Sequence, residues 1–202
     1  MTEGNVAGNY YDKYNTKNPV ARYLVAGFME SLKELTGPLE IKSLVEVGCG
    51  EGRVAHFLKE LRPKLDIEAN DVSPEVIAMA KKEYPGIKFS VRSATDLKYR
   101  DCSFDMVVAC EVLEHLKDPD AAIREIKRVA GKYAIFSVPR EPVWSLLNLA
   151  RGKYIKDLGN TPGHLQKWGK KGFLTLLGKY FRVERALTPL PWTMALCVKE
   201  KR

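Results

Sequence analysis

The stretch LVEVGCGEGR, residues 44–53, decides the fold class of this chain. Its apolar run carries one acid, Glu46, and leads into glycines at positions 48, 50 and 52. Glycines at the turn between a strand and a helix allow a tight turn and let the backbone approach a ligand closely. The spacing G-x-G-x-G differs from the G-x-G-x-x-G of dinucleotide-binding turns, because Arg53 occupies the sixth place. A carboxylate just before the glycines would repel a pyrophosphate, so this turn favours a ligand with a cation or an amino group.

Outward from this turn, strand-like apolar runs alternate with helix-like segments. Helices are expected at 18–36, 52–61, 73–84, 120–130 and about 171–180, and strands at 43–49, 66–72, 88–94, 104–110 and 133–139. Such an order predicts an α/β fold, with a parallel sheet covered by helices on both faces. The last two strands, 181–188 and 192–200, are separated by only three residues. Because that connection is too short for a parallel crossover, these strands are expected to be antiparallel.

Length and composition restrict what the chain can be. Its 202 residues suffice for one domain with a full core and are short for two, so we expect a single domain over residues 1–202. No apolar run is long enough to span a membrane, and the N-terminal segment has no hydrophobic region of a signal peptide. The four cysteines show no C-x-x-C spacing, which favours free thiols in a reducing cytoplasm.

The net charge of +8 is concentrated in the last third of the chain. Residues 140–202 hold 13 Lys or Arg and 4 Asp or Glu, whereas residues 1–139 hold 20 basic and 21 acidic residues. Such an asymmetry favours an acidic partner: a phosphate, an anionic membrane surface or nucleic acid. The alternative is a basic solvated face that only aids solubility.

Asp71 is the second residue that indicates the ligand. It ends the second strand, where a carboxylate can accept hydrogen bonds from both ribose hydroxyls of a nucleoside. In an open α/β sheet the ligand lies beyond the carboxyl ends of the strands, so Asp71 and the glycine turn border one crevice. A ligand with a ribose, an amino-acid cation and no phosphate suits both Asp71 and Glu46, and S-adenosylmethionine is such a ligand.

Three stretches, VEVGCGEGR, ANDVSPEVIAMAKK and SFDMVVACEVLEHLKDP, resemble the class I S-adenosylmethionine-dependent methyltransferases in order and spacing. The resemblance covers roughly residues 40–139. It implies a Rossmann-like three-layer sandwich with a seven-stranded, mostly parallel sheet whose last strand is antiparallel. It also implies that the methionine end of the cofactor is met by Glu46, Gly48, Cys49 and Gly50, the ribose by Asp71 and the adenine by Val72.

The adenine side departs from the pattern of the family. Relatives often carry an acid after the third strand that binds the adenine amino group, but here the run is RSATD, residues 92–96. Ser93 holds the expected place, Ala94 follows it and Asp96 is offset by three, so all three are candidates for cofactor binding. The alternative for Asp96 is a turn-forming surface acid. Cys110, at the end of the fourth strand, is a further candidate beside the cofactor.

The N-terminal segment NYYDKYNTKNP, residues 9–19, is rich in aromatic residues and is another candidate part of the site. In related enzymes such a segment closes over the cofactor, which makes Tyr14, together with Tyr10 and Tyr11, a candidate lid residue in the N-terminal lid and helix, residues 1–36. The alternative is a surface leader without a role.

Methyl transfer from a sulfonium is an in-line displacement, for which the protein mainly positions the reactants and excludes water. A hydroxyl acceptor must also lose its proton, either to a base or with the help of a metal that lowers the pKa of the hydroxyl.

In CEVLEHL, residues 110–116, the side chains of Glu111, Glu114 and His115 would share one face of a helical turn. With His164 of TPGHLQKW they are candidate ligands for Mg²⁺, Mn²⁺ or Zn²⁺, and this pattern resembles metal-dependent 2′-O-methyltransferases of small-RNA 3′ ends and O-methyltransferases of ubiquinone synthesis. Since E-V-L-E-H also occurs in relatives not known to bind metal, the alternative is that His115 or His164 is the general base.

The segment 140–170 is expected to lie over the carboxyl ends of the strands as a substrate-side insertion, because it follows the fifth strand. It mixes apolar and basic side chains: Trp144, Leu146, Leu147, Leu149, Arg151, Lys153, Tyr154 and Lys156. A basic amphipathic helix can lie on an anionic membrane, and the same features suit a lid over an apolar or phosphorylated substrate. The alternative is a plain packing helix.

The sequence therefore favours a methyltransferase acting on an oxygen of a small-molecule or lipid-linked acceptor, in the cytoplasm or in peripheral contact with a membrane. A metal-dependent RNA 2′-O-methyltransferase gains from the basic last third, but the sequence has no separate RNA-binding domain and no aromatic-basic stacking platform. A non-catalytic domain would bind S-adenosylmethionine without turnover. A nicotinamide enzyme is disfavoured by Arg53 and Glu46. The acceptor and the oligomeric state do not follow from the sequence.

Overall fold

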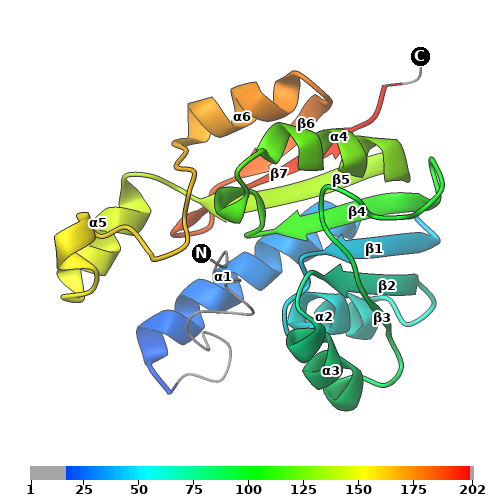
Figure 1. Ribbon diagram of the computed structural model, residues 1–202, viewed down its shortest axis with the longest axis horizontal. Coiled ribbons are helices and arrows are strands. Elements are labelled where there is room, and N and C mark those ends of the chain that lie inside the picture. Colours follow the sequence, from blue (N-terminus) through cyan, green and yellow to red (C-terminus); the bar gives the residue numbers. More distant parts are fainter. Residues whose placement is uncertain (1–16, 201–202) are drawn as a thin grey trace, which may run out of the picture.

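The computed structural model describes residues 17–200, and its elements alternate as the sequence predicts (Figure 1). Helix α1 (Pro19–Thr36) precedes the first strand. The strands are β1 (Ser43–Val47), β2 (Asp66–Asp71), β3 (Lys88–Val91), β4 (Phe104–Cys110), β5 (Ala130–Pro139), β6 (Arg182–Leu187) and β7 (Trp192–Val198). The other helices are α2 (Arg53–Leu61), α3 (Pro74–Glu83), α4 (Pro119–Val129), α5 (Val143–Ala150) and α6 (Lys170–Gly178), with 3₁₀ turns η1 (Leu113–His115) and η2 (Ile155–Asp157).

The seven strands form one sheet in the order β3-β2-β1-β4-β5-β7-β6. All pairs from β3 to β5 are parallel, whereas β7 is antiparallel to both β5 and β6. This confirms the predicted seven-stranded, mostly parallel sheet with an antiparallel last strand. The chain moves outward from β1 in one direction through β2 and β3, then returns to the other side of β1 as β4. The carboxyl ends of β1 and β4 are therefore the topological switch point, where open α/β sheets bind ligands.

Helices cover both faces of the sheet and bury two apolar clusters. The first cluster joins α1, α2 and α3 to one face through side chains such as Phe28, Leu58 and Ile77. The second joins α4 and α6 to the other face through residues such as Ile126 and Phe173. Figure 1 shows the same division, with α4 and α6 on one side of the strands and α1, α2 and α3 on the other. The Rossmann-like three-layer sandwich is thus confirmed.

Three helices begin in the same way, with a capping side chain followed by proline. Asn18, Ser73 and Asp118 each accept a hydrogen bond from a backbone N–H in the first turn of the helix that they precede. Proline at the next position suits a helix start, because its missing N–H would have no partner within the helix. These signals explain why the starts of α1, α3 and α4 fall within a residue of their predicted positions.

Two strand ends differ from the prediction by three residues, and the ends of the other strands differ by two at most. Strand β3 was expected to reach residue 94 but ends at Val91, because the chain then folds back on itself in an isolated bridge between Ser93 and Asp96. Strand β5 begins at Ala130, three residues early, because α4 passes into it without a loop. Strand β3 is therefore shorter and β5 longer than predicted, and the order of the elements is unchanged.

The insertion 140–170 contains α5 and η2 and extends beyond the carboxyl ends of β4 and β5 (Figure 1). This is the side of the sheet on which the sequence places it. Among residues 17–200, no helix combines the length and the apolar character needed to cross a membrane.

Candidate active site

The turn between β1 and α2 forms the floor of the site. Gly48, Gly50 and Gly52 all adopt a positive φ, at 68°, 51° and 81°, a region that other residues rarely adopt. A Cβ atom on Gly48 would overlap the side chain of Val112, and one on Gly52 would lie 2.7 Å from the ring of Phe89. The third glycine is therefore needed here, one place earlier than in a dinucleotide-binding turn, so that the turn can pack against β3.

Glu46 is a buried carboxyl at the base of this turn. Its side chain lies within β1 and is 2% exposed, and among the described residues its Oε2 atom has no hydrogen-bond partner. Burial is the main cause that raises the pKa of Glu46 from its usual 4.5 to about 8. The hydrogen bond from the Ala55 amide lowers the pKa, and the charge of Asp71 makes a smaller contribution that raises it. A buried carboxyl with an unused oxygen is suited to receive an ammonium group, as predicted for the amino group of the cofactor.

Asp71 links the glycine turn to the start of α3. Its Oδ2 accepts a hydrogen bond from the Gly50 amide at 2.9 Å, and its Oδ1 accepts one from the Ser73 amide at 3.0 Å. Each carboxylate oxygen has a second lone pair, so both can still accept from ribose hydroxyls. Asp71 thus has a structural role that the sequence did not predict, in addition to the proposed binding role.

Cys49 lies in the same turn with a buried thiol. Burial, with a smaller contribution from Glu46, raises the pKa of the Cys49 thiol far above its usual value, so the thiol stays neutral. A neutral thiol offers little to a charged ligand. Cys49 is therefore expected to contribute to cofactor binding through its backbone.

The residues that would contact the adenine follow β2 and β3, and they are partly or fully exposed. Val72 is 53% exposed, which leaves an apolar side chain available to an adenine ring. The Ser93 hydroxyl lies 2.9 Å from that of Thr95, and the exposed Asp96 pairs with Lys98. Ser93 and Ala94 face the core side of this turn more than Asp96 does, since both are partly buried. Cys110 packs against the first apolar cluster at the end of β4, and Tyr14 lies outside the described residues.

The expectation that Glu111, Glu114 and His115 share one face of a helical turn is wrong for Glu111. The turn is η1, which begins only at Leu113, and Glu111 precedes it with a φ of 58°. That left-handed conformation turns Glu111 toward β7, where its carboxylate accepts a hydrogen bond from the indole N–H of Trp192. The sequence gives no signal for this conformation, because left-handed glutamate is rare.

Glu114, His115 and His164 come together, although 48 residues or more separate His164 from the other two. One ligand atom from each lies within 4.8 Å of the others, and Glu114 is buried while both histidines are partly exposed. The rings of His115 and His164 have centroids 4.9 Å apart. The cluster thus joins the end of β4 to the insertion.

Hydrogen bonds fix how the loop with His164 lies on η1. The Gly163 carbonyl lies 3.0 Å from Nδ1 of His115, so in the neutral ring this nitrogen carries the proton and Nε2 carries the lone pair. The amides of Leu165 and Gln166 both donate to the Glu114 carbonyl, at 2.7 and 3.0 Å. Such a neutral imidazole can accept a proton or bind a metal through Nε2.

Aromatic rings extend from the histidine pair to α1. The ring of Trp144 stacks near His164 at 5.9 Å, Trp192 lies 6.1 Å from Trp144, and Phe28 of α1 contacts Trp192 edge-on at 5.1 Å. The sequence did not single out Trp192 or Phe28. A signal for Trp192 exists, because an antiparallel β7 must begin beside the carboxyl end of β5, where Trp192 pairs with Pro139.

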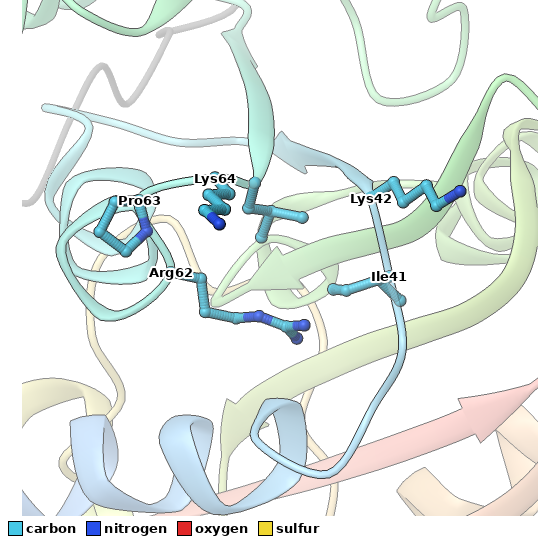
Figure 2. A pocket seen from close by; sticks show the side chains of 6 residues that line it. Ile41, Lys42, Arg62, Pro63 and Lys64 are labelled. Atoms are coloured by element: carbon cyan, nitrogen blue, oxygen red, sulfur yellow. The ribbon is translucent and has the colours of Figure 1, made fainter.

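Two other features lie away from this site. His56 stacks on Tyr84 with a centroid distance of 4.3 Å, as expected of a packing histidine. A hollow of about 450 Å³ lies at the opposite end of the sheet, where β1 and β2 begin (Figure 2). Its Arg62 donates to the carbonyl of Thr36 at 3.1 Å, so this arginine holds the end of α1 against the end of α2.

The fold and the site have the features that the resemblance to class I S-adenosylmethionine-dependent methyltransferases implies. These are a switch point with three left-handed glycines, a buried acid before them and an acid that ends the next strand. Residues 45–137 match the family model described as a methyltransferase domain. Over this region the chain is similar to the methyltransferases of that class.

Curated relatives agree with this assignment. The chain is 30% identical over 123 residues to a ubiquinone biosynthesis O-methyltransferase of Xanthomonas oryzae pv. oryzae, which covers 57% of this chain and 51% of that protein. It is also 30% identical over 130 residues to a demethylmenaquinone methyltransferase of Chlorobaculum parvum, covering 62% and 53%. The chain thus spans about half the length of the curated relatives that it matches. A solved structure of a SAM-dependent methyltransferase from Aquifex aeolicus has the same fold, with a TM-score of 0.71, 16% identity and coverage of 91% and 94%.

Proposed function

We propose that the protein transfers the methyl group of S-adenosylmethionine to an oxygen of a small-molecule or lipid-linked acceptor. The observation that carries the proposal is the pairing of His115 with His164 beyond the carboxyl end of β4, the strand that pairs with the Glu46 strand β1. A hydroxyl needs a base close to the transferred methyl group, and a partly exposed histidine pair provides one. The names of the relatives in quinone biosynthesis support an acceptor of this kind.

In this mechanism the chain contributes binding, orientation and a proton acceptor. Glu46 receives the ammonium group of the cofactor, and Asp71 receives its ribose hydroxyls. The acceptor oxygen attacks the methyl carbon, the carbon–sulfur bond breaks, and S-adenosylhomocysteine leaves as a neutral thioether. The proton of the acceptor hydroxyl passes to Nε2 of a histidine in the pair. The partly exposed ring of Trp144, which packs near the buried Trp192, excludes water and offers apolar area to the acceptor.

A divalent metal at Glu114, His115 and His164 is a second part of the proposal. The donor set fits, because it offers one carboxylate and two imidazoles within 4.8 Å, and the Gly163 carbonyl orients the ring of His115. A bound metal would lower the pKa of an acceptor hydroxyl and so replace the base. In this arrangement Glu111 is not a ligand, since its carboxylate is turned to Trp192.

The test is transfer of radiolabel from S-[methyl-³H]adenosylmethionine to a panel of acceptors. The panel contains phenols, catechols, polyprenylated phenols, amines and short RNAs, each with and without Mn²⁺. The proposal predicts that label enters a hydroxylated small molecule or lipid. Label only in RNA would favour the RNA 2′-O-methyltransferase, and cofactor binding without transfer to any acceptor would favour a non-catalytic domain.

A lipid-linked acceptor would require contact with a membrane surface, and the insertion has suitable side chains. Leu146, Leu147, Ile155 and Leu158 are exposed, Leu158 at 76%. The neighbouring basic residues Arg151, Lys153 and Lys156 are exposed as well. Apolar side chains beside cations are the pattern of a segment that lies on an anionic bilayer.

We therefore expect the protein to sediment with phosphatidylglycerol vesicles more than with phosphatidylcholine vesicles, and less at high salt. Replacing Leu146 and Leu147 together by Gln should weaken this binding about tenfold or more, because two exposed apolar side chains that would enter the bilayer are lost. The control is the same double exchange at Val20 and Met79, which are exposed on α1 and α3. Equal sedimentation with both lipids, or an unchanged double variant, would contradict membrane contact through α5.

A further inference from the structure

Thr161 lies at the junction between α5 and the loop that carries His164. It is 8% exposed, and its hydroxyl oxygen accepts a hydrogen bond from the indole N–H of Trp144 at 2.9 Å. The same oxygen accepts a second bond from the side-chain amide of Asn148 at 3.3 Å. One buried hydroxyl therefore satisfies donors from two side chains of α5.

The backbone of the same residue holds His164. The His164 amide donates to the Thr161 carbonyl at 3.1 Å, which closes the turn from Thr161 to His164. Across this turn, the rings of Trp144 and His164 stack with an interplanar angle of 30°. Thr161 thus fixes both partners of the stack, Trp144 through its hydroxyl and His164 through its carbonyl.

The loop 159–166 is held on both sides. On the α5 side, Asn148 donates to the Gly159 carbonyl at 2.8 Å, and a Cβ atom on Gly159 would overlap the backbone of Ser145. On the other side, the loop is bound to η1 through the contacts of His115 and Glu114 described above. A change in how Trp144 sits is therefore transmitted to His164, because the loop between them has little freedom to absorb it.

We propose that Thr161 is a positioning residue, whose hydroxyl sets the ring of Trp144 and thereby the orientation of His164 for methyl transfer. The inference rests on the proposed function of the histidine pair. A residue that only filled space here could be valine, which has nearly the shape of threonine. The hydroxyl is needed because the indole N–H of Trp144 would otherwise lose its acceptor and the Asn148 amide would keep only the Gly159 carbonyl, so these donors would reorient.

The experiment compares Thr161→Val, which removes the hydroxyl, with Thr161→Ser, which retains it. The chain has three histidines and three tryptophans, so each imidazole and indole signal in an NMR spectrum can be assigned by single substitutions. Thr161→Val should move the indole N–H resonance of Trp144 and change the NOE contacts of the His164 ring, while the ring contacts of His56 stay as in the wild type. Thr161→Ser should leave all three as in the wild type. Once an acceptor is known, Thr161→Val should lower kcat about tenfold, since small misplacement of reacting groups is costly.

Wild-type signals for Trp144 and His164 in Thr161→Val would overturn the proposal. If Thr161→Val does not fold, Trp144→Phe removes the indole donor alone. Unchanged NOE contacts between the rings of His164 and His115 in that variant would also overturn the proposal, and altered contacts would support it. Binding of S-adenosylhomocysteine to each variant is measured in parallel, and should stay within about twofold of the wild type. If the wild type does not bind S-adenosylhomocysteine, that result counts against the proposed function. The role of Thr161 is decided separately, by the NMR comparison of the variants.

Discussion

Glu46→Gln is expected to weaken the binding of S-adenosylhomocysteine roughly 100-fold, because a buried ammonium would lose the charge of its partner on β1. The same substitution should stabilise the cofactor-free protein. Glu46 is 2% exposed and its pKa rises from 4.5 to about 8, so the folded chain must keep a proton that the unfolded chain releases. Glutamine has nearly the same shape and needs no proton.

The sign of the pH dependence follows from this shift. Between pH 4.5 and about 8 the folded protein binds more protons than the unfolded chain, so the contribution of Glu46 to stability is present at low pH and is lost as the pH rises to about 8. Wild type and Glu46→Gln should therefore be equally stable near pH 4.5. At pH 8 the variant should be more stable by on the order of 3 kcal/mol, which allows for relaxation around the buried group.

Urea unfolding at pH 5 and pH 8 and calorimetric titration with S-adenosylhomocysteine measure the two effects. Glu60→Gln is the matched control, because Glu60 is an exposed glutamate on α2. It should change neither quantity. A Glu46→Gln variant that binds as tightly as the wild type would remove Glu46 from the cofactor site, and equal stability at pH 8 would mean that its carboxyl is not buried in solution.

His164→Ala is expected to lower the rate of methyl transfer about 100-fold or more, which is the usual size of a general-base contribution. Binding of S-adenosylhomocysteine should stay nearly unchanged, because the cofactor residues lie on β1 and β2 and His164 lies on the insertion. His115→Ala should act in the same direction, and the double variant should cost little more than either one, because residues that act as a unit are not additive. The assay is the radiolabel transfer described above, and His56→Ala is the control.

The same variants distinguish a metal-binding role of the two histidines from a general-base role. Mn²⁺ titrated into protein saturated with S-adenosylhomocysteine should bind with micromolar affinity if Glu114, His115 and His164 are ligands, and this binding should disappear in His164→Ala. Transfer that needs no metal but still falls in His164→Ala would assign the base role alone. A His164→Ala variant with wild-type activity would remove the histidine pair from the mechanism.

Local patterns in the sequence predicted most of the fold because their causes are local. Side-chain caps followed by prolines mark the starts of three helices, and apolar runs of strand length mark the sheet. Glu46 and the glycines were found because strand, acid and turn follow one another within a few residues. The contact of Asp71 with the Gly50 amide was missed, since it joins residues 21 positions apart.

The acceptor side was predicted less completely, because it is built by long-range contacts. His164 meets His115 only because the amides of the loop after Gly163 bind to η1. Glu111 is not part of the predicted cluster, because its backbone is left-handed, a conformation that is rare for glutamate and that the sequence does not predict. Thr161 and Trp192 gave no local pattern, and their roles follow from partners 17 and 81 residues away.

Calorimetric titration with S-adenosylhomocysteine tests most directly whether the residues at the carboxyl ends of β1 and β2 bind S-adenosylmethionine. The account predicts binding of one molecule per chain with micromolar affinity, together with much weaker binding of NADH, whose pyrophosphate would meet Glu46. No heat of binding with S-adenosylhomocysteine at millimolar concentration, or tighter binding of NADH, would contradict the account.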